Sequence, residues 1–381
     1  MLKAIVRNQS SRLGTPAFAR LATPSLTAVR FATATTTPAI KQPTPSPQDG
    51  KSQEEINKNL PVDSINVETP NFEPGTRGFF DIKTRVYNNQ GIMENDDDKF
   101  LTKAEYNHVE YTEAGLHRVK VSHRTPETLG DKVCWNLTMT CRRIFDFVTG
   151  FHEPVTGEPG EFLGTRYQMT EGKWMTRVIF LESIAAIPGN VASMLRALRS
   201  CRLLKRDKAW IESLRDEAEN ERMHLLTFIK IGKPSWFTRS IMYVGQGIFT
   251  NAFFLIYLIN PRYCHRFVGT LEEEAVKTYT LLLKQMKETD ELPLFDNMII
   301  PTVAVDYWPG LAPESSFYQL ILQIRADESK HREINHTLAN LDYDNDRNPF
   351  ALQIKGVDKP QPNMGLDVVR PNGWARKDLI L

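Results

Sequence analysis

The sequence predicts an all-α protein built as a helix bundle, and three observations carry this prediction. Apolar residues recur at helical spacing through much of residues 173–340, strand signals are scarce, and Glu-x-x-His pairs recur along the chain. Residues three apart lie one turn from each other on the same face of an α-helix. A Glu and a His at that spacing can bind one metal ion together, and helix bundles hold pairs of iron ions in this way.

The composition describes a folded protein without a nucleic-acid partner. The 381 residues include 47 Lys and Arg against 46 Asp and Glu, so no excess of positive charge attracts nucleic acid. A hydrophobic fraction of 41% is too low for a polytopic membrane protein. The four cysteines have neither a metal-binding nor a redox spacing, so we expect free thiols at Cys134, Cys141, Cys201 and Cys264.

The two ends of the chain differ in composition from its centre. Residues 1–48 carry six basic residues and no acid, with Ser, Thr and Ala between them, which is typical of a mitochondrial transit peptide; a disordered tail is the alternative. Residues 49–130 are predicted to form a flexible N-terminal arm. Residues 131–340 form the predicted helical domain, and the proline-rich residues 341–381 form an irregular C-terminal tail.

Helices account for most of the central domain. A loop is expected over 151–172, where glycine and proline recur, and Pro188-Gly189 is expected to kink or break the helix that contains it. The predicted helices cover residues 133–147, 173–200, 206–230, 238–258, 262–289 and 312–340.

One segment raises the possibility of membrane contact. Residues 241–259 contain no charge over 19 residues, which is long enough to span a bilayer. Gly245, Gln246, Gly247 and Asn251 interrupt its apolar character, and Arg177 and Glu182 interrupt the other long apolar helix. A bundle helix or a face lying at the membrane surface therefore fits better than a membrane span.

Four Glu-x-x-His pairs occur, and their surroundings distinguish them. Glu221/His224 and Glu328/His331 each continue an apolar stripe of their helix, so they are predicted to face inward. Glu105/His108 lies in a polar segment and is predicted to face solvent. The pair Glu333/His336 is five residues beyond Glu328/His331, about 140° round the helix, and is predicted to point elsewhere.

Two further carboxylates complete a candidate ligand set. Glu182 stands among almost wholly apolar residues, and a lone buried carboxylate is costly unless it is paired or bound to a metal. Among three consecutive acids, Glu272 shares the apolar stripe of its helix, whereas Glu273 is predicted to face outward and Glu274 is left undecided. The predicted ligands of two iron ions are Glu182, Glu221, His224, Glu272, Glu328 and His331.

Four carboxylates balance the charge of two Fe(II) ions, although manganese suits the same donors. The alternative is a helical bundle with surface Glu and His. Asp327 is predicted to orient a ligand imidazole, and Asn220 and His265 are candidates for similar work, with capping or surface roles as the alternative. Tyr279, two turns beyond Glu272, is placed to donate an electron and a proton during O–O cleavage; a core tyrosine is the alternative.

These residues resemble the four motifs of the mitochondrial alternative oxidases. The matching segments are residues 181–183 (LES, with Ser183 where the family usually has Thr), 220–225 (NERMHL), 271–275 (LEEEA) and 325–331 (RADESKH). The resemblance implies a ferritin-like four-helix bundle with two additional helices. It also implies a cyanide-insensitive ubiquinol oxidase that reduces O₂ to water at a di-iron centre. Such a protein would be a homodimer bound to one leaflet of the inner membrane, on the matrix side (monotopic and membrane-interfacial).

The resemblance also implies a quinol pocket. Its residues would be Arg142, Asp146, Arg177, Leu181, Thr278 and Tyr279. Arg142 and Asp146 are four residues apart, so a simple salt bridge within one helix is the alternative for that pair. With no spanning helix to carry protons, the reaction is predicted to be non-electrogenic. The rival functions are another di-iron carboxylate oxygenase or desaturase, a plastid quinol oxidase and a ferritin-like iron store.

Overall fold

The computed structural model describes residues 84–87, 104–155, 160–351 and 354–380. Within this part of the chain the protein is almost wholly helical, which confirms the predicted all-α class. The transit peptide predicted over residues 1–48 lies outside the described residues. The six long helices are α3 (Leu129–Thr149), α4 (Glu171–Leu203), α5 (Trp210–Ile231), α6 (Trp236–Ile259), α7 (Pro261–Glu288) and α10 (Phe317–Leu338).

Short elements complete the fold. The two strands pair antiparallel, with Thr84 opposite Pro234 and Val86 opposite Gly232. They are too short to form a sheet core, so the scarcity of strand signals in the sequence agrees with the structure. The short elements are β1 (Thr84–Val86), β2 (Gly232–Pro234), α2 (Glu113–Arg118), α8 (Pro293–Asp296), α9 (Thr302–Tyr307) and the 3₁₀ helix η2 (Arg376–Asp378).

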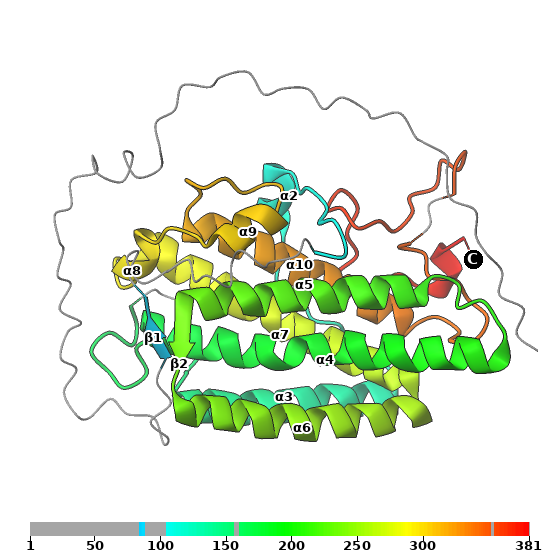
Figure 1. The fold of residues 1–381 in the computed structure, drawn as a ribbon, viewed down its shortest axis with the longest axis horizontal. Helices are drawn as coiled ribbons and strands as arrows, with labels where there is room; N and C mark the ends of the chain where they lie inside the picture. Colours follow the sequence, from blue (N-terminus) through cyan, green and yellow to red (C-terminus); the bar gives the residue numbers. More distant parts are fainter. Residues whose placement is uncertain (1–83, 88–103, 156–159, 352–353, 381) are drawn as a thin grey trace, which may run out of the picture. The chain divides into compact units, whose positions relative to one another are not determined.

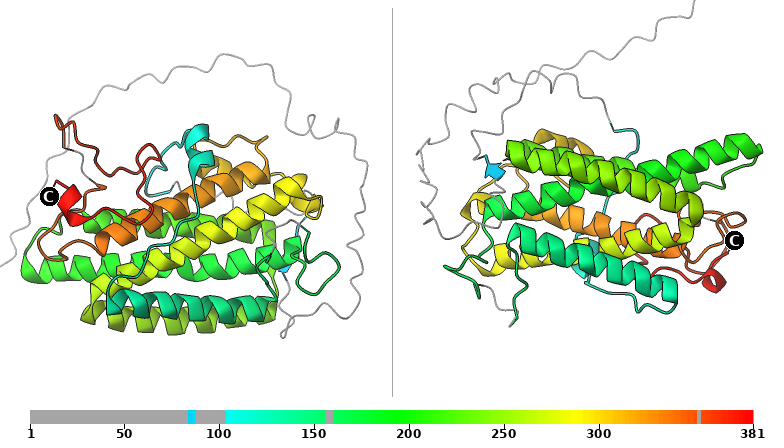
Figure 2. Two further views of the ribbon diagram at one scale, coloured as in Figure 1. Left: turned by 180° about the vertical axis from the view of Figure 1, so that it is seen from behind. Right: turned by 90° about the horizontal axis from the view of Figure 1, so that it is seen from below.

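Four helices form the bundle, and two lie outside it (Figure 1). Helix α4 packs along α5 and α7 packs along α10, and these two pairs enclose the buried apolar core. Helix α3 packs mainly on α7, and α6 packs mainly on α4. Both outer helices lie along the same side of the bundle (Figure 2). This arrangement confirms a four-helix bundle with two additional helices.

The outer helices expose large apolar side chains to solvent. Helices α4 and α6 are both long and apolar enough to cross a membrane, but half of the most apolar window of α4 is buried in the bundle, against 11% for α6. The exposed apolar residues include Leu129, Val133, Leu137, Ile144 and Phe147 of α3, with Trp236, Tyr243, Val244, Ile248, Leu255 and Ile259 of α6.

Capping residues set the helix ends more sharply than apolar periodicity. Thr128 and Asp131 form a capping box that starts α3 at Leu129, four residues before the predicted start. Ser316 caps α10 in the same way, so this helix begins at Phe317 rather than near residue 312. Helix α5 begins at Trp210 because Lys208 and Ala209 adopt left-handed backbone angles, with φ of 62° and 65°.

Helix α4 does not end at Pro188-Gly189, where a kink or a break was expected. It runs from Glu171 to Leu203. At Gly189 a Cβ atom would lie only 2.5 Å from the carbonyl oxygen of Leu214, so glycine allows α5 to approach α4 closely. Packing along this contact outweighs the hydrogen bond that Pro188 cannot donate.

Part of the predicted flexible arm is ordered and packed against α10. Tyr111 and Leu116 are buried, and Arg325 of α10 donates a hydrogen bond to the carbonyl oxygen of Leu116 at 3.0 Å. Trp374 of the irregular tail is also fully buried, and it donates hydrogen bonds to Thr337 and Glu333 of α10. Every residue of α10 from 320 to 338 is therefore buried. Within residues 104–130, Tyr111 and Leu116 are the apolar anchors that hold this segment against α10.

Candidate metal centre

The six predicted ligands converge from the four bundle helices. Glu182 comes from α4, Glu272 from α7, and α5 and α10 each supply a Glu-x-x-His pair, and none of the six is more than 6% exposed. Their donor atoms form two groups of four, each within 4.8 Å of one another. Among the described residues these are the groups that could hold a metal: Glu182, Glu221, His224 and Glu328; and Glu221, Glu272, Glu328 and His331.

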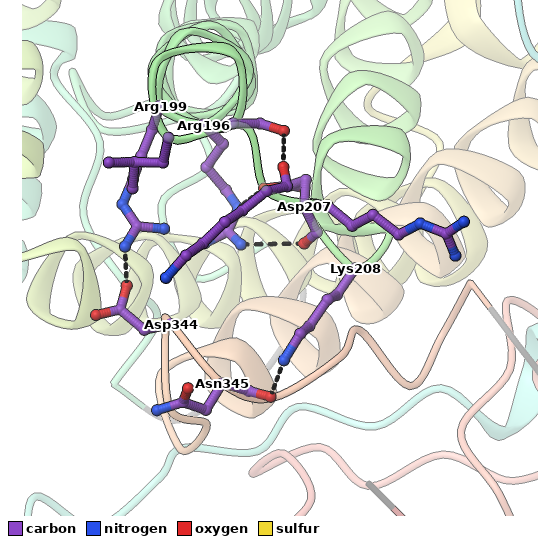
Figure 3. A pocket seen from close by; sticks show the side chains of 10 residues that line it. Arg196, Arg199, Asp207, Lys208, Asp344 and Asn345 are labelled. Carbon is purple, nitrogen blue, oxygen red and sulfur yellow. Dashed lines mark hydrogen bonds and ion pairs between the residues drawn. The ribbon is translucent and has the colours of Figure 1, made fainter.

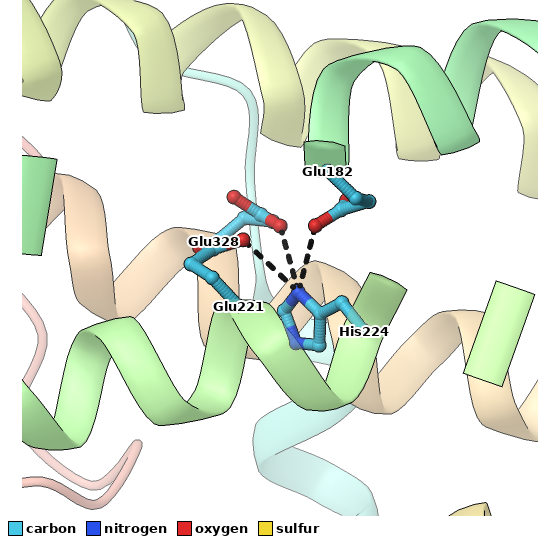
Figure 4. Close-up of side chains that lie close together, drawn as sticks. All are labelled: Glu182, Glu221, His224 and Glu328. Carbon is cyan, nitrogen blue, oxygen red and sulfur yellow. Dashed lines mark ion pairs between the residues drawn. The ribbon is translucent and has the colours of Figure 1, made fainter. Parts of the chain in front are cut away.

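Two carboxylates, Glu221 and Glu328, belong to both groups. Nδ1 of His224 lies 3.4 Å from Oε2 of Glu182, 3.5 Å from Oε2 of Glu221 and 3.3 Å from Oε1 of Glu328 (Figure 4). In the second group, Nδ1 of His331 lies 2.6 Å from Oε1 of Glu221. Glu221 therefore stands between the two imidazoles.

These atoms attract one another electrostatically, but several of them lack the geometry of a hydrogen bond. Oε2 of Glu182, both carboxylate oxygens of Glu221 and Nδ1 of both histidines are buried without a hydrogen-bond partner among the described residues. Each such atom costs about 1–3 kcal/mol in an apo protein. Divalent cations would satisfy all of them at once. Four carboxylates with two imidazoles and no thiolate suit iron or manganese.

Crowding of the carboxylates perturbs their acidity. Burial and then the charge of Glu221 raise the pKa of Glu182 to about 8. Burial, followed by Glu221 and Glu182, also raises the pKa of Glu328 to about 8. For Glu221, burial is outweighed by His331 and His224, which lower its pKa. The metal-free site thus holds protons that bound cations would displace.

Asp327 orients the imidazole of His224. Its Oδ2 lies 3.1 Å from Nε2 of His224 and accepts hydrogen bonds from Asn220 at 3.2 Å and from Trp308 at 2.9 Å. Its Oδ1 lies 2.8 Å from Nε2 of His108 and accepts a hydrogen bond from Tyr111 at 2.8 Å. Asp327 thus contacts a ligand imidazole, whereas Asn220 contacts Asp327 and Tyr307.

His108 was predicted to face solvent, and this is wrong. Only 6% of its side chain is exposed. Tyr111 and the short helix α9, which carries Tyr307, surround its ring. The burial of His108 could not be predicted, because its neighbours in sequence are polar and show no helical period. Its contacts come from α9 and α10, which are distant in sequence.

Two other residues differ from expectation. His265 does not reach the ligands, since its ring nitrogens lie 3.1 Å from the hydroxyl of Tyr257 and 3.0 Å from Oδ1 of Asn335. Glu273 does not face outward, because it is fully buried and lies 2.8 Å from Nε2 of His336. The tail and residues 123–124 cover this side of α7 and α10. As predicted, the pair Glu333/His336 stays outside the metal groups.

A narrow apolar cavity of about 160 Å³ reaches the metal centre from the side of α3 and α6. Glu182, Glu272 and Glu328 form part of its wall, together with Tyr279, whose hydroxyl donates a hydrogen bond to Glu182. Four predicted quinol-pocket residues, Arg142, Leu181, Thr278 and Tyr279, also line it, as does Glu274, which the sequence left undecided.

Arg142 is the main cation of this cavity, and its partners fix its position. It donates to Asp146 at 2.9 Å, to Glu274 at 3.0 Å and to Thr278 at 3.0 Å. The buried guanidinium of Arg177 also binds Asp146, at 2.6 Å. Asp146 and Arg177 were predicted to belong to the quinol pocket but are not among the residues that line the cavity, and Asp146 joins the two guanidinium groups.

A larger hollow of about 460 Å³ lies at the turn between α4 and α5 (Figure 3). Basic residues dominate it, but several of them are already paired within it. Arg196 donates to Asp207 at 2.7 Å, and Lys208 donates to the carbonyl oxygen of Asn345 at 2.5 Å. The second contact ties the turn to the tail, and none of the described residues that line the hollow belongs to a metal-binding group.

Comparison with known protein families identifies the family of this chain. The alternative oxidase family profile matches residues 111–340, which contain the four motifs and all six ligands. The chain belongs to the alternative oxidase family.

Relatives within this family cover most of the chain. Alternative oxidase 1, mitochondrial, of Candida albicans is 62% identical over 85% of this chain and 86% of its own. The mitochondrial alternative oxidase of Scheffersomyces stipitis is 57% identical over 82% of this chain and 88% of its own. That of Aspergillus niger is 48% identical over 72% of this chain and 77% of its own. The resemblance inferred from the motifs is thereby confirmed.

Membership of the alternative oxidase family makes the protein an oxidoreductase, as predicted. Sequence reasoning missed the outer contacts of the site, which are His108, Tyr111, Tyr307 and Trp308. Tyr307 is the last residue of α9 and Trp308 follows it, and this helix of six residues is too short to show a period. The only indication in the sequence was indirect. Asp327 is a buried acid, and the imidazole of His224 alone cannot pair with both of its carboxylate oxygens.

Proposed function

We propose that this alternative oxidase oxidises ubiquinol and reduces O₂ to water at a di-iron centre, without cyanide sensitivity and without moving charge across the membrane. One observation carries the proposal. Three of the six ligands, Glu182, Glu272 and Glu328, form the inner wall of an apolar cavity that also holds Arg142 and Tyr279. A quinol requires such a slot, with apolar walls for its ring and a few polar groups for its hydroxyls.

Each group of residues at this site would have its own role in quinol oxidation. The six ligands would hold the iron pair, which would supply the electrons and binding sites for O₂ reduction. Arg142 and Glu274 would orient the quinol hydroxyls. Glu182 accepts a hydrogen bond from Tyr279, so this pair lies where a proton can pass between the cavity and the ligands. Tyr279 would also supply an electron and a proton while O₂ is reduced, and quinol oxidation would restore both.

The exposed apolar face of α3 and α6 supports attachment to one leaflet of a membrane. The cavity wall includes residues of both helices, such as Phe145 and Phe249, so a membrane-dissolved quinol would enter from this face. The relatives are named mitochondrial, and we place the protein on the matrix side of the inner membrane as a homodimer, after import directed by residues 1–48. Attachment to one leaflet provides no path for protons across the bilayer.

The decisive experiment removes Glu182. Glu182→Ala deletes a ligand and the hydrogen-bond acceptor of Tyr279, so we expect loss of cyanide-resistant, quinol-dependent oxygen uptake in the purified protein. Glu212→Ala changes an exposed glutamate at the start of α5 and should retain full activity. Full activity of Glu182→Ala would overturn the assignment.

The rival functions differ from the proposed one in their iron content and in the ratio of quinol oxidised to O₂ consumed. An oxygenase or a desaturase would consume O₂ only when a second organic substrate is oxidised, whereas the proposed reaction consumes two quinols for each O₂ and nothing else. An iron store would bind many irons per chain and oxidise no quinol. Iron content near two per chain, together with a quinol to O₂ ratio of two, separates the three.

A further inference from the structure

The hydroxyl of Thr138 on α3 is buried without a partner. The residue is 1% exposed, and its Oγ1 has no hydrogen-bond partner in the described part of the chain. Buried hydroxyls are nearly always paired, so an exception needs an explanation. Thr138 also lines the cavity that leads to the metal centre.

Other threonines in these helices behave differently. Thr140, on the same helix, donates to the carbonyl oxygen of Asn136 at 2.7 Å, and Thr280 donates to that of Val276 at 2.7 Å. This bond to the fourth preceding residue is the usual solution for a helical threonine. Thr227 is a second exception, but it does not line the cavity.

Thr138 is placed to meet a ligand that Arg142 also binds. The two residues are four apart, so they share a face of α3 with about 6 Å between them along the helix axis. That separation is close to the width of a six-membered ring with its substituents. Around them the wall is mainly apolar and includes Phe145, Phe180 and Phe249.

We propose that the hydroxyl of Thr138 donates a hydrogen bond to an alkoxy oxygen on the quinol ring, so that the enzyme prefers alkoxy-substituted benzoquinols to purely alkylated ones. An ether oxygen only accepts hydrogen bonds, and a threonine hydroxyl can supply the donor. This inference rests on the proposed quinol oxidase function. It adds a residue that selects among quinols, whereas Arg142 and Glu274 would bind the hydroxyls that all quinols share.

The test is Thr138→Val, which keeps the side-chain shape and removes the hydroxyl. The kcat/KM of the purified full-length enzyme is measured with a short-tailed dimethoxy benzoquinol and with tetramethylbenzoquinol. We expect a loss of about 3- to 10-fold for the dimethoxy quinol and little change for the tetramethyl quinol. The melting temperature should stay constant or rise, because an unpaired buried hydroxyl is removed.

Two variants control the result. Thr138→Ser keeps the hydroxyl and should restore the preference, and Thr140→Val removes an exposed hydroxyl from the same helix and should leave both rates unchanged. Equal losses on both quinols, or a lower melting temperature for Thr138→Val, would show a structural role and overturn the inference. Wild-type protein that oxidises neither quinol would instead overturn the proposed function itself.

Discussion

Asp327 decides which nitrogen of His224 faces the carboxylates. Its Oδ2 lies 3.1 Å from Nε2, which leaves Nδ1 directed at Glu182, Glu221 and Glu328. A neutral imidazole can bind a metal through Nδ1 only if its proton is on Nε2, and an ionised carboxylate holds the proton there. Burial disfavours the charged form of Asp327, but His108 and His224 outweigh it and lower its pKa.

Asp327→Asn tests this role. The amide can present its NH₂ group to Nε2, which favours the tautomer whose proton occupies Nδ1, so we expect iron affinity to fall about 10- to 100-fold. The measurement is iron retained per chain during titration with a chelator. Asp306→Asn, at an exposed aspartate of α9, is the control and should behave as wild type. Unchanged iron retention in Asp327→Asn would show that the tautomer is fixed by other contacts.

At the level of residues, the sequence predicted which six side chains converge in the bundle, but it did not predict what surrounds them. Glu221 and His224 could be found because ligand residues must share the inward stripe of a long helix. His108 could not be found, because its burial depends on α9 and α10, which are about 200 residues away. Glu273 was wrongly predicted to face outward. The apolar stripe of α7 shows which face of the helix meets the bundle core, but it does not show that residues 123–124 cover the face that carries Glu273.

Helices α3 and α6 carry many exposed large apolar side chains, and both lie on the same side of the bundle. Val244 and Ile248 of α6 are 63% and 67% exposed and lie four residues apart, on one face of the helix. The same side holds the wall residues through which the cavity approaches Glu182. The two outer helices thus place an exposed apolar surface and a path to the predicted ligands on the same side of the bundle.

Val244→Glu combined with Ile248→Glu should detach the protein from lipid without unfolding it. Each substitution places a charge where an apolar side chain would enter the bilayer, so we expect binding to liposomes to weaken about tenfold or more. The measurement is flotation with vesicles of inner-membrane composition. Leu163→Glu, at a loop residue that is also 63% exposed, is the control. Equal flotation of all three proteins would place the membrane contact elsewhere.

At the level of elements, periodicity predicted which helices exist but not where they end. The start of α10 depends on Ser316 and Gln319, whose side chains bond each other's backbone at the helix end. Pro188 suggested a break in α4 because proline is unfavourable inside a helix. However, Gly189 allows α5 to pack closely against α4, and the helix continues. Tertiary packing overrides local preference in such cases.

In the whole described unit, segments distant in sequence enclose α10. Residues 104–128 supply His108 and Tyr111 to Asp327, and the tail, which contacts this segment through Asn372, supplies Trp374 to Glu333. The ligand helix is therefore shielded from water on the faces that the bundle does not cover. Sequence reasoning missed this, because neither segment has the periodicity of a helix or a strand.

Trp374→Ala tests whether the tail stabilises the bundle. Trp374 is fully buried, donates to Glu333 at 2.7 Å and stacks against Arg370 at 3.8 Å, so its removal should cost ~3–5 kcal/mol of unfolding free energy. We expect a melting temperature lower by several degrees. Activity should persist in the cold, because no ligand contacts Trp374. The matched control is Trp236→Ala, at a tryptophan that is 80% exposed on α6. Equal melting temperatures for the two variants would mean that the tail only covers α10 and contributes nothing to its stability.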